Sequence, residues 1–371
     1  MSVTTLDSFR TEKGVDLEQV PVAWKAWGRL NASRDNVVIV CHALTGNTDV
    51  DDWWAPLLGP GRVLDTDHFF VICFNVAGSP YGSVSPVTTN PDTGEPYGVT
   101  FPDFSIRDTV ALHRRVLDDM DISGVELAIG ASMGGMQVLE WGFHTDLVKA
   151  LCPIAVGGRH SAWCIAWSAS QRQAIISDPK WKGGYYPADD PPAHGLSVAR
   201  MMAMISYRSQ SSFEKRFGRA RMKDNPGEPM AVESYLQYQG EKLVARFDAN
   251  CYIALTRQMD SHDVACGRGT YPEVLKDIKQ PTLVVGIDSD ILYPLSEQHE
   301  LVQYMPSAEM AVLTSPDGHD AFLIDFEQLS AHLRPWMARV LSERDYRSPS
   351  QNEPDHGILS ASISPSDADI A

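Results

Sequence analysis

The residue with the clearest chemical potential is Ser132, at the centre of the motif Gly-Ala-Ser-Met-Gly of residues 130–134. A largely apolar run, residues 125–129, leads into this motif, and a helix-like stretch, residues 136–143, follows it. A Gly-x-Ser-x-Gly motif between a strand and a helix is typical of a nucleophile elbow, a turn too sharp for side chains on both flanks. The pattern predicts that the Ser132 hydroxyl is a nucleophile and that the amide of Met133 faces the negative charge that develops during acyl transfer.

A nucleophilic serine requires a general base, and the base requires a carboxylate that orients it. His319 is the best candidate for the base, because it follows a glycine just after the strand-like residues 310–313. The carboxylate is either Asp288 or Asp290, which both follow the strand-like residues 282–287, and sites in open α/β sheets gather at such carboxyl ends. The spacing favours Asp290, which lies farther past the strand, and leaves Asp288 as an alternative that could instead cap the turn.

The second amide of the expected oxyanion hole lies in the loop of residues 42–46, which follows the strand-like residues 37–41. In enzymes with a nucleophile elbow, the loop after an early strand supplies this donor. The loop reads His-Ala-Leu-Thr-Gly, and the amide of Leu44 is the expected donor. His42 is interpreted as a structural histidine that packs below the elbow, without a catalytic role.

These residues need a sheet to position them, and short apolar runs recur along the chain to supply it. Most of the runs are continuously apolar, which suits strands that are covered on both faces in a parallel sheet. A helical pattern over residues 106–120 stands between two of them, and alternating strands and helices predict an α/β fold with a mostly parallel sheet. The runs are residues 37–41, 69–74, 127–129, 151–156, 282–287 and 310–313.

The alternation of strands and helices stops after residue 156, and helix-like segments dominate residues 160–275. These segments cover residues 161–176, 195–207 and 232–260. We interpret the block as a helical lid inserted over the carboxyl ends of the strands, with an unrelated second domain as the alternative. The predicted organisation is therefore a first part of the core (1–157), the helical lid insertion (158–275), a second part of the core (276–344) and a polar, disordered tail (345–371).

Composition narrows the classes of partner. The 371 residues carry a net charge of −17, which argues against binding to nucleic acid or to an anionic membrane. No apolar run approaches the length of a membrane span, and the first residues do not read as a signal peptide. The six cysteines include no Cys-x-x-Cys pair, and no metal-ligand cluster has a recognisable spacing, so we expect a reduced, cytoplasmic protein without a bound metal.

Eight motifs, in order along the chain, resemble those of the homoserine O-acetyltransferase family of α/β-hydrolase-fold acyltransferases. The resemblance runs from about residue 16 to residue 342. Three longer strings, at residues 51–54, 160–164 and 170–173, look most like the fungal-type branch, which also contains deacetylcephalosporin C acetyltransferase and serine O-acyltransferases. The eight motifs are His-Ala-Leu-Thr-Gly (42–46), Gly-Ser-Pro-Tyr-Gly-Ser (78–83), Asn-Pro-Asp-Thr-Gly (90–94), Gly-Ala-Ser-Met-Gly-Gly-Met (130–136), Tyr-Arg-Ser (207–209), Phe-Gly-Arg (217–219), Asp-Ile-Leu-Tyr-Pro (290–294) and Gly-His-Asp-Ala-Phe (318–322).

The resemblance implies roles for particular residues. The family places its acid directly before x-Leu-aromatic-Pro, which selects Asp290. Its substrate-binding residues fall on Arg200, Tyr207 and Asp320. An arginine suits the carboxylate of an amino acid as a planar fork, and a carboxylate beside the histidine suits the ammonium group. The chain departs from many members at Ala131, where they carry a second glycine, but alanine is small and should not disturb the elbow.

The activity implied by the resemblance is transfer of an acetyl group from acetyl-CoA to the hydroxyl of L-homoserine through an acyl-Ser132 intermediate, a step of methionine biosynthesis. Acetyl-CoA would act as a co-substrate, with no permanently bound cofactor, and the family suggests a homodimer through the lid helices. Serine or a secondary-metabolite alcohol such as deacetylcephalosporin C is the alternative acceptor, and succinyl-CoA the alternative donor. An esterase or thioesterase with the same triad, and a non-catalytic binding protein, are the rival readings from other classes.

Overall fold

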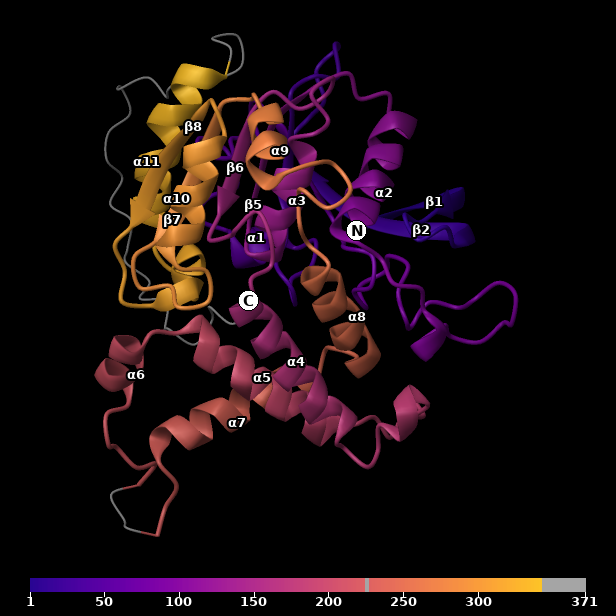
Figure 1. Ribbon diagram of the computed structural model, residues 1–371, viewed down its shortest axis with the longest axis vertical. Helices are drawn as coiled ribbons and strands as arrows, with labels where there is room; N and C mark the ends of the chain where they lie inside the picture. Colours follow the sequence, from indigo (N-terminus) through magenta and orange to yellow (C-terminus); the bar gives the residue numbers. More distant parts are fainter. Residues whose placement is uncertain (224–226, 342–371) are drawn as a thin grey trace.

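The computed structural model describes residues 1–223 and 227–341, and its centre is one eight-stranded sheet in the order β1-β2-β4-β3-β5-β6-β7-β8 (Figure 1). The six strands from β4 to β8 in this order pair in parallel, whereas β1 and β2 pair antiparallel with each other and β2 with β4. The predicted α/β fold with a mostly parallel sheet is therefore confirmed. The strands are β1 (Ser2–Arg10), β2 (Asp16–Trp27), β3 (Val37–Cys41), β4 (Phe70–Phe74), β5 (Val125–Ala131), β6 (Leu151–Ile154), β7 (Thr282–Ile287) and β8 (Ala308–Leu313).

The burial of each strand explains which of them the sequence revealed. Every residue of β3, β5, β6 and β7 is buried, as continuous apolar runs covered on both faces require. The hairpin of β1 and β2 was not among the predicted strands. Its buried and exposed residues are interspersed, with charged side chains on the open face, so it lacks the continuous run that marked the others.

Helices from both parts of the core pack against the sheet. Contacts join α3 to β3, β5 and β6, α10 to β7 and β8, and α11 to β8. Helix α2 begins at a capping box in which Ser105 and Asp108 satisfy each other's backbone amides, which explains the sharp start of the predicted helix. These helices are α1 (Val50–Trp53), α2 (Ile106–Asp119), α3 (Met133–Trp141), α9 (Tyr271–Asp277), α10 (Leu295–Tyr304) and α11 (Phe326–Val340), with the short 3-10 helices η1 (Gly98–Thr100) and η3 (Gly318–Leu323).

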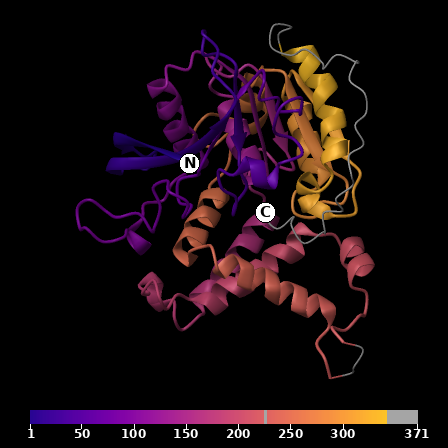
Figure 2. The same cartoon turned by 180° about the vertical axis from the view of Figure 1, so that it is seen from behind.

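The chain between β6 and β7 supplies a separate group of helices, which we call the inserted helices. They are α4 (Ala162–Ile176), α5 (Ala193–Tyr207), α6 (Gln210–Arg216), α7 (Ala231–Val244) and α8 (Ala249–Asp260), with the 3-10 helix η2 (Lys182–Gly184). In Figures 1 and 2, α4 to α7 lie together beyond one end of the strands. Helix α5 contacts η3, which follows β8, so this end is the one at which the parallel strands finish.

The inserted helices differ from the expected pattern at two points. Helix α6 was not among the predicted segments. The helix-like segment 232–260 is two helices, because Asp248 caps the start of α8 by accepting the amide of Cys251 at 2.9 Å. Among the described residues, no helix combines the length and the apolar character that a membrane span requires. The predicted tail, residues 345–371, lies outside the described residues.

Candidate active site

Ser132 lies at the junction of β5 and α3 with φ 56° and ψ −124°, a conformation that non-glycine residues seldom adopt. Such strain costs about 1–3 kcal/mol and is typical of functional turns. A Cβ on Gly130 or Gly134 would approach the carbonyl oxygen of Cys41 to 2.5 Å or 2.1 Å, so both positions exclude any side chain. The backbone thus has the geometry expected of a nucleophile elbow.

His319 and Asp290 meet in the protein interior, with 2.7 Å between Nδ1 of the histidine and Oδ2 of the carboxylate. The second oxygen, Oδ1, accepts the amides of Leu292 and Tyr293 at 2.8 Å and 2.9 Å. These bonds hold the carboxylate in one orientation. Nε2 of His319 has no hydrogen-bond partner within the described part of the chain. A carboxylate on Nδ1–H leaves the lone pair on Nε2, which is what a general base requires.

The structure separates the two candidate acids that spacing alone left open. Oδ1 of Asp288 accepts the amide of Ser315 at 3.0 Å, and the hydroxyl of Ser289 accepts the amide of Gly318 at 2.9 Å. Asp288 and Ser289 therefore tie the loop after β7 to the loop after β8. Asp290 is the carboxylate that this tie brings to the histidine.

The histidine loop packs directly on the Tyr-Arg-Ser motif that ends α5. Gly318 has φ +68°, and a Cβ there would lie 2.8 Å from backbone atoms of Tyr207, Arg208 and Ser209. The ring of Tyr207 lies beside that of His319, with 5.8 Å between the ring centroids. The inserted helices thus form one wall of the site, and the glycine before the histidine permits the close approach.

The three residues expected to bind substrate gather around this wall. Arg200 is buried on α5, and its guanidinium lies 5.7 Å from the centre of the Tyr207 ring. Burial raises the pKa of Tyr207 to about 12, so its hydroxyl remains a neutral hydrogen-bonding group. Asp320 is also buried and follows His319 directly.

Arg208 is the middle residue of the Tyr-Arg-Ser motif, and the sequence assigns no role to it. Its Nε lies 3.0 Å from Oδ2 of Asp320, and its Nη1 lies 3.3 Å from Oδ1 of Asp317. The guanidinium therefore stabilises the carboxylate that is expected to face the substrate ammonium group. Local spacing gives no sign of a contact between residues 208 and 320. The one signal in the sequence was the position of Arg208 beside Tyr207 in the motif.

The loop of residues 42–46 orients the amide of Leu44. The carbonyl of Ala43 accepts the amide of Gly46 at 3.0 Å and lies 2.8 Å from Nδ1 of His42. Because a trans peptide is planar, the Leu44 amide points away from these two donors. Nε2 of His42 accepts the amide of Val76 at 3.1 Å, and burial lowers the pKa of His42 to about 4, so the ring is neutral with its proton on Nδ1. This agrees with a structural role for His42.

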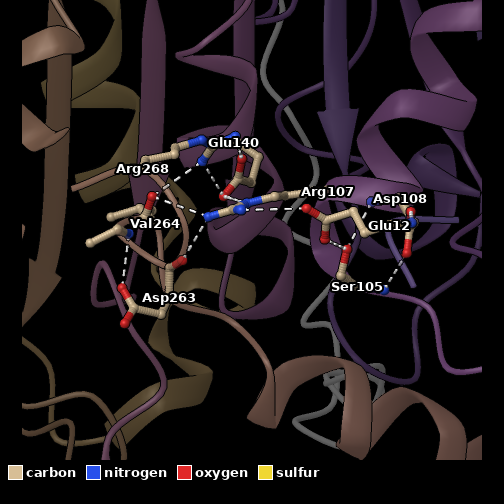
Figure 3. A network of polar contacts seen from close by, with 9 residues as sticks. Glu12, Ser105, Arg107, Asp108, Glu140, Asp263, Val264 and Arg268 are labelled. Carbon is tan, nitrogen blue, oxygen red and sulfur yellow. Dashed lines mark hydrogen bonds and ion pairs between the residues drawn. The ribbon is translucent and has the colours of Figure 1, made fainter. Parts of the chain in front are cut away.

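The helix that carries the other expected donor, Met133, is anchored by a network of charges (Figure 3). Glu140 of α3 is buried and lies 2.8 Å from Nη2 of Arg268 and 3.4 Å from Nε of Arg107. Arg107, on α2, also donates to the carbonyls of Asp263 and Val264. The network ties the elbow helix to α2 and to the segment that follows α8.

Two cavities differ in how they lie relative to the expected site residues. A small cavity beside the elbow is lined by His42, Ala43 and Ala131 among others. A larger cavity of about 270 Å³ lies between the loop around Gly98 and helix α8, and none of the expected site residues line it. Within residues 1–223 and 227–341, no group of histidine, cysteine and acidic side chains could hold a metal ion.

Comparison with known proteins places this geometry in a family. The family model of the alpha/beta hydrolase fold matches residues 36–326. A homoserine O-acetyltransferase of Salinibacter ruber is 60% identical over 343 residues, which cover 91% of this chain and 97% of that protein. The solved homoserine O-acetyltransferase from Staphylococcus aureus is 28% identical with a TM-score of 0.74, covering 94% of this chain and 97% of that one. Esterase E22 is 25% identical with a TM-score of 0.83, covering 91% and 99%.

Proposed function

This chain belongs to the alpha/beta hydrolase fold family and, within it, to the homoserine O-acetyltransferases, and we propose that it moves an acetyl group from acetyl-CoA to the side-chain hydroxyl of L-homoserine. The observation that carries the proposal is the 60% identity to the Salinibacter ruber enzyme over 91% of the chain. It is therefore an acyltransferase that serves methionine biosynthesis. The strained turn at Ser132 and the pairing of Asp290 with His319 support the same chemistry.

In the first half of the reaction, the oxygen of Ser132 attacks the thioester carbonyl of acetyl-CoA while Nε2 of His319 takes the hydroxyl proton. The amides of Leu44 and Met133 stabilise the oxyanion. The carbon–sulfur bond then breaks, the thiolate of coenzyme A leaves with the proton from His319, and an acetyl ester remains on Ser132. Asp290 keeps the imidazole in the required tautomer and stabilises its protonated form.

In the second half, the homoserine hydroxyl gives its proton to His319 and attacks the acetyl ester. A second oxyanion forms in the same place and collapses to O-acetylhomoserine, with the proton returned to the oxygen of Ser132. Arg200 is the proposed partner of the substrate carboxylate, with Tyr207 beside it, and Asp320 the proposed partner of the ammonium group. The pairing of Asp320 with Arg208 supports this role for Asp320, because the cation holds its carboxylate in place.

We propose further that the inserted helices act as a lid that keeps water from the acetyl-enzyme. The contact of Gly318 with the end of α5 supports this role, because it places residues 207–209 against the histidine loop. Exclusion of water favours an alcohol acceptor over hydrolysis. The likeness to esterase E22 favours hydrolysis as the second candidate function, since the same triad serves both reactions.

Large apolar side chains are exposed on the inserted helices, which supports the proposal of a homodimer formed through them. Trp163, Ile205 and Tyr238, on α4, α5 and α7, are 51%, 42% and 54% exposed. Large exposed apolar side chains mark protein interfaces where they gather on one face. Light scattering of the purified protein would test the dimer, with the monomer mass as the contrary result.

Five of the six described cysteines are buried as free thiols, which supports a reducing, cytoplasmic setting.

The test of the function is release of coenzyme A thiol from acetyl-CoA with homoserine, serine, deacetylcephalosporin C or water as acceptor. We expect homoserine to accelerate release strongly and the Ser132→Ala variant to lose at least about 10³-fold in rate. Preference for serine or the cephalosporin alcohol would reassign the acceptor. Equal release with and without any alcohol would make the enzyme a hydrolase.

A further inference from the structure

Arg246 joins the inserted helices to the loop that carries Leu44. It lies in the short connection between α7 and α8, and its Nη1 donates to the carbonyl of Thr45 at 2.8 Å and to the hydroxyl of Tyr81 at 2.6 Å. Nη2 lies 3.5 Å from the hydroxyl of Thr45. The neighbouring Phe247 packs edge-on against Tyr81, with 5.8 Å between ring centroids. The connection is therefore held at this loop by two consecutive side chains.

The carbonyl that Arg246 binds belongs to the peptide bond between Thr45 and Gly46. The amide of the same peptide bond donates to the carbonyl of Ala43 at 3.0 Å. That carbonyl in turn shares a planar peptide with the amide of Leu44. The guanidinium, two peptide planes and the Leu44 amide thus form a continuous series, in which the orientation of each plane determines the next.

A positive charge at the start of this series also acts through polarisation. A cation on the Thr45 carbonyl makes the Gly46 amide a stronger donor, and hydrogen bonds in series strengthen one another by roughly 10–30% each. The effect is directed at the Leu44 amide, where the oxyanion would form. Burial of Thr45 keeps water from replacing the guanidinium at the carbonyl.

We propose that Arg246 is a positioning residue for acyl transfer, which orients and polarises the Leu44 amide through the Thr45–Gly46 and Ala43–Leu44 peptides. The oxyanion hole is then complete only when the α7–α8 connection is docked on the core. This inference rests on the proposed function, because it takes Leu44 as an oxyanion donor. It adds a residue outside the triad and outside the substrate-binding group to the reaction.

The test compares Arg246→Met, which removes the donors but keeps the aliphatic stem, with Arg246→Lys and with Arg257→Met. Arg257 is exposed on α8 beside the larger cavity, so its loss controls for removing an arginine from the same segment. Removing one oxyanion donor costs about 10²–10³-fold in rate, so misorienting one should cost about 10–100-fold. We expect this loss in the rate of Ser132 acetylation, with partial recovery in Arg246→Lys and none of it in Arg257→Met.

Two readouts separate positioning from a structural role. The KM for homoserine and the thermal midpoint of Arg246→Met should stay near the wild-type values, since the substrate residues lie elsewhere. The affinity for phenylboronic acid, whose tetrahedral adduct on Ser132 places an oxygen at the Leu44 amide, should fall by the same 10–100-fold. The proposal is overturned if boronate affinity and acetylation stay within twofold of wild type, or fall only together with the thermal midpoint.

The boronate measurement needs neither acetyl-CoA nor homoserine. If no acceptor accelerates thiol release by the wild type, but Arg246→Met still lowers the boronate affinity, the proposed function alone is contradicted. If homoserine accelerates release by the wild type, but Arg246→Met leaves the boronate affinity unchanged, this inference alone is contradicted.

Discussion

Replacing Asp290 by asparagine should abolish most of the activity through the tautomer of His319. Oδ1 of Asp290 accepts two backbone amides, from Leu292 and Tyr293, and the oxygen of an asparagine would keep both bonds. The amide nitrogen would then face Nδ1 of His319, where the carboxylate oxygen now lies at 2.7 Å. Since an NH2 group only donates, Nδ1 would have to accept, and the ring proton would move to Nε2.

A histidine with its proton on Nε2 cannot take the proton of Ser132. The same change in a serine protease triad lowers kcat by about 10⁴-fold, which corresponds to about 5 kcal/mol in the barrier. We expect a loss of that order in Asp290→Asn, measured as thiol release from acetyl-CoA with saturating homoserine. The protein should remain folded, because the side chain keeps its size and its two backbone bonds.

Asp288→Asn provides the matched control on the same turn. Its oxygen would still accept the amide of Ser315, and within the described residues the hydrogen bond to Nδ1 of His319 comes from Asp290, so activity should stay within a few-fold of wild type. Equal losses in both variants, or a loss below tenfold in Asp290→Asn, would refute the assignment of Asp290 as the orienting carboxylate.

Two further predictions concern stability. Glu140→Gln should lower the free energy of unfolding by about 2–4 kcal/mol, because it leaves Arg107 and Arg268 facing a neutral group in a partly buried network; urea unfolding would measure this, and an unchanged midpoint would contradict it. The free energy of unfolding should also fall as the pH drops below about 6.5, because burial lowers the pKa values of four histidines. Below that pH these histidines bind protons in the unfolded chain, whereas in the folded protein they stay neutral until about pH 3–4. Each histidine should contribute about 2 kcal/mol of this loss between pH 6.5 and pH 5. Glu297, whose pKa burial raises to about 7, should offset part of the loss. Urea unfolding at pH 7 and pH 5 would measure the difference, and equal free energies of unfolding at the two pH values would contradict the reasoning. The four histidines are His42, His113, His160 and His262.

The parallel part of the fold was predictable because most of its strands are covered on both faces. Residues 37–41 and 282–287 appear in the structure with the same bounds as in the prediction, and all of their residues are buried. The β1–β2 hairpin escaped notice since its open face tolerates charged side chains. The break between α7 and α8 was missed because only a short connection, with Asp248 as the N-cap of α8, interrupts a helical pattern that is otherwise continuous.

The sequence by itself determined the elbow, because its requirement is local: a strand, a turn without side chains at Gly130 and Gly134, and a helix within a dozen residues. It also supplied the histidine and a pair of candidate acids, each marked by its place after a strand. Resemblance to a family added Arg200, Tyr207 and Asp320, which no local pattern distinguishes from ordinary helix residues.

Only the tertiary structure showed what each of two neighbouring groups of the same chemistry binds. Spacing favoured Asp290 over Asp288 and the resemblance selected it, and the bonds of each to a loop some thirty residues away give the physical reason. The same holds for the cations, since Arg208 reaches Asp320 and Arg246 reaches Thr45 across more than a hundred residues of chain. Hydrogen bonds and ion pairs depend on distances of a few ångströms, and those distances exist only after the sheet and the inserted helices have packed together.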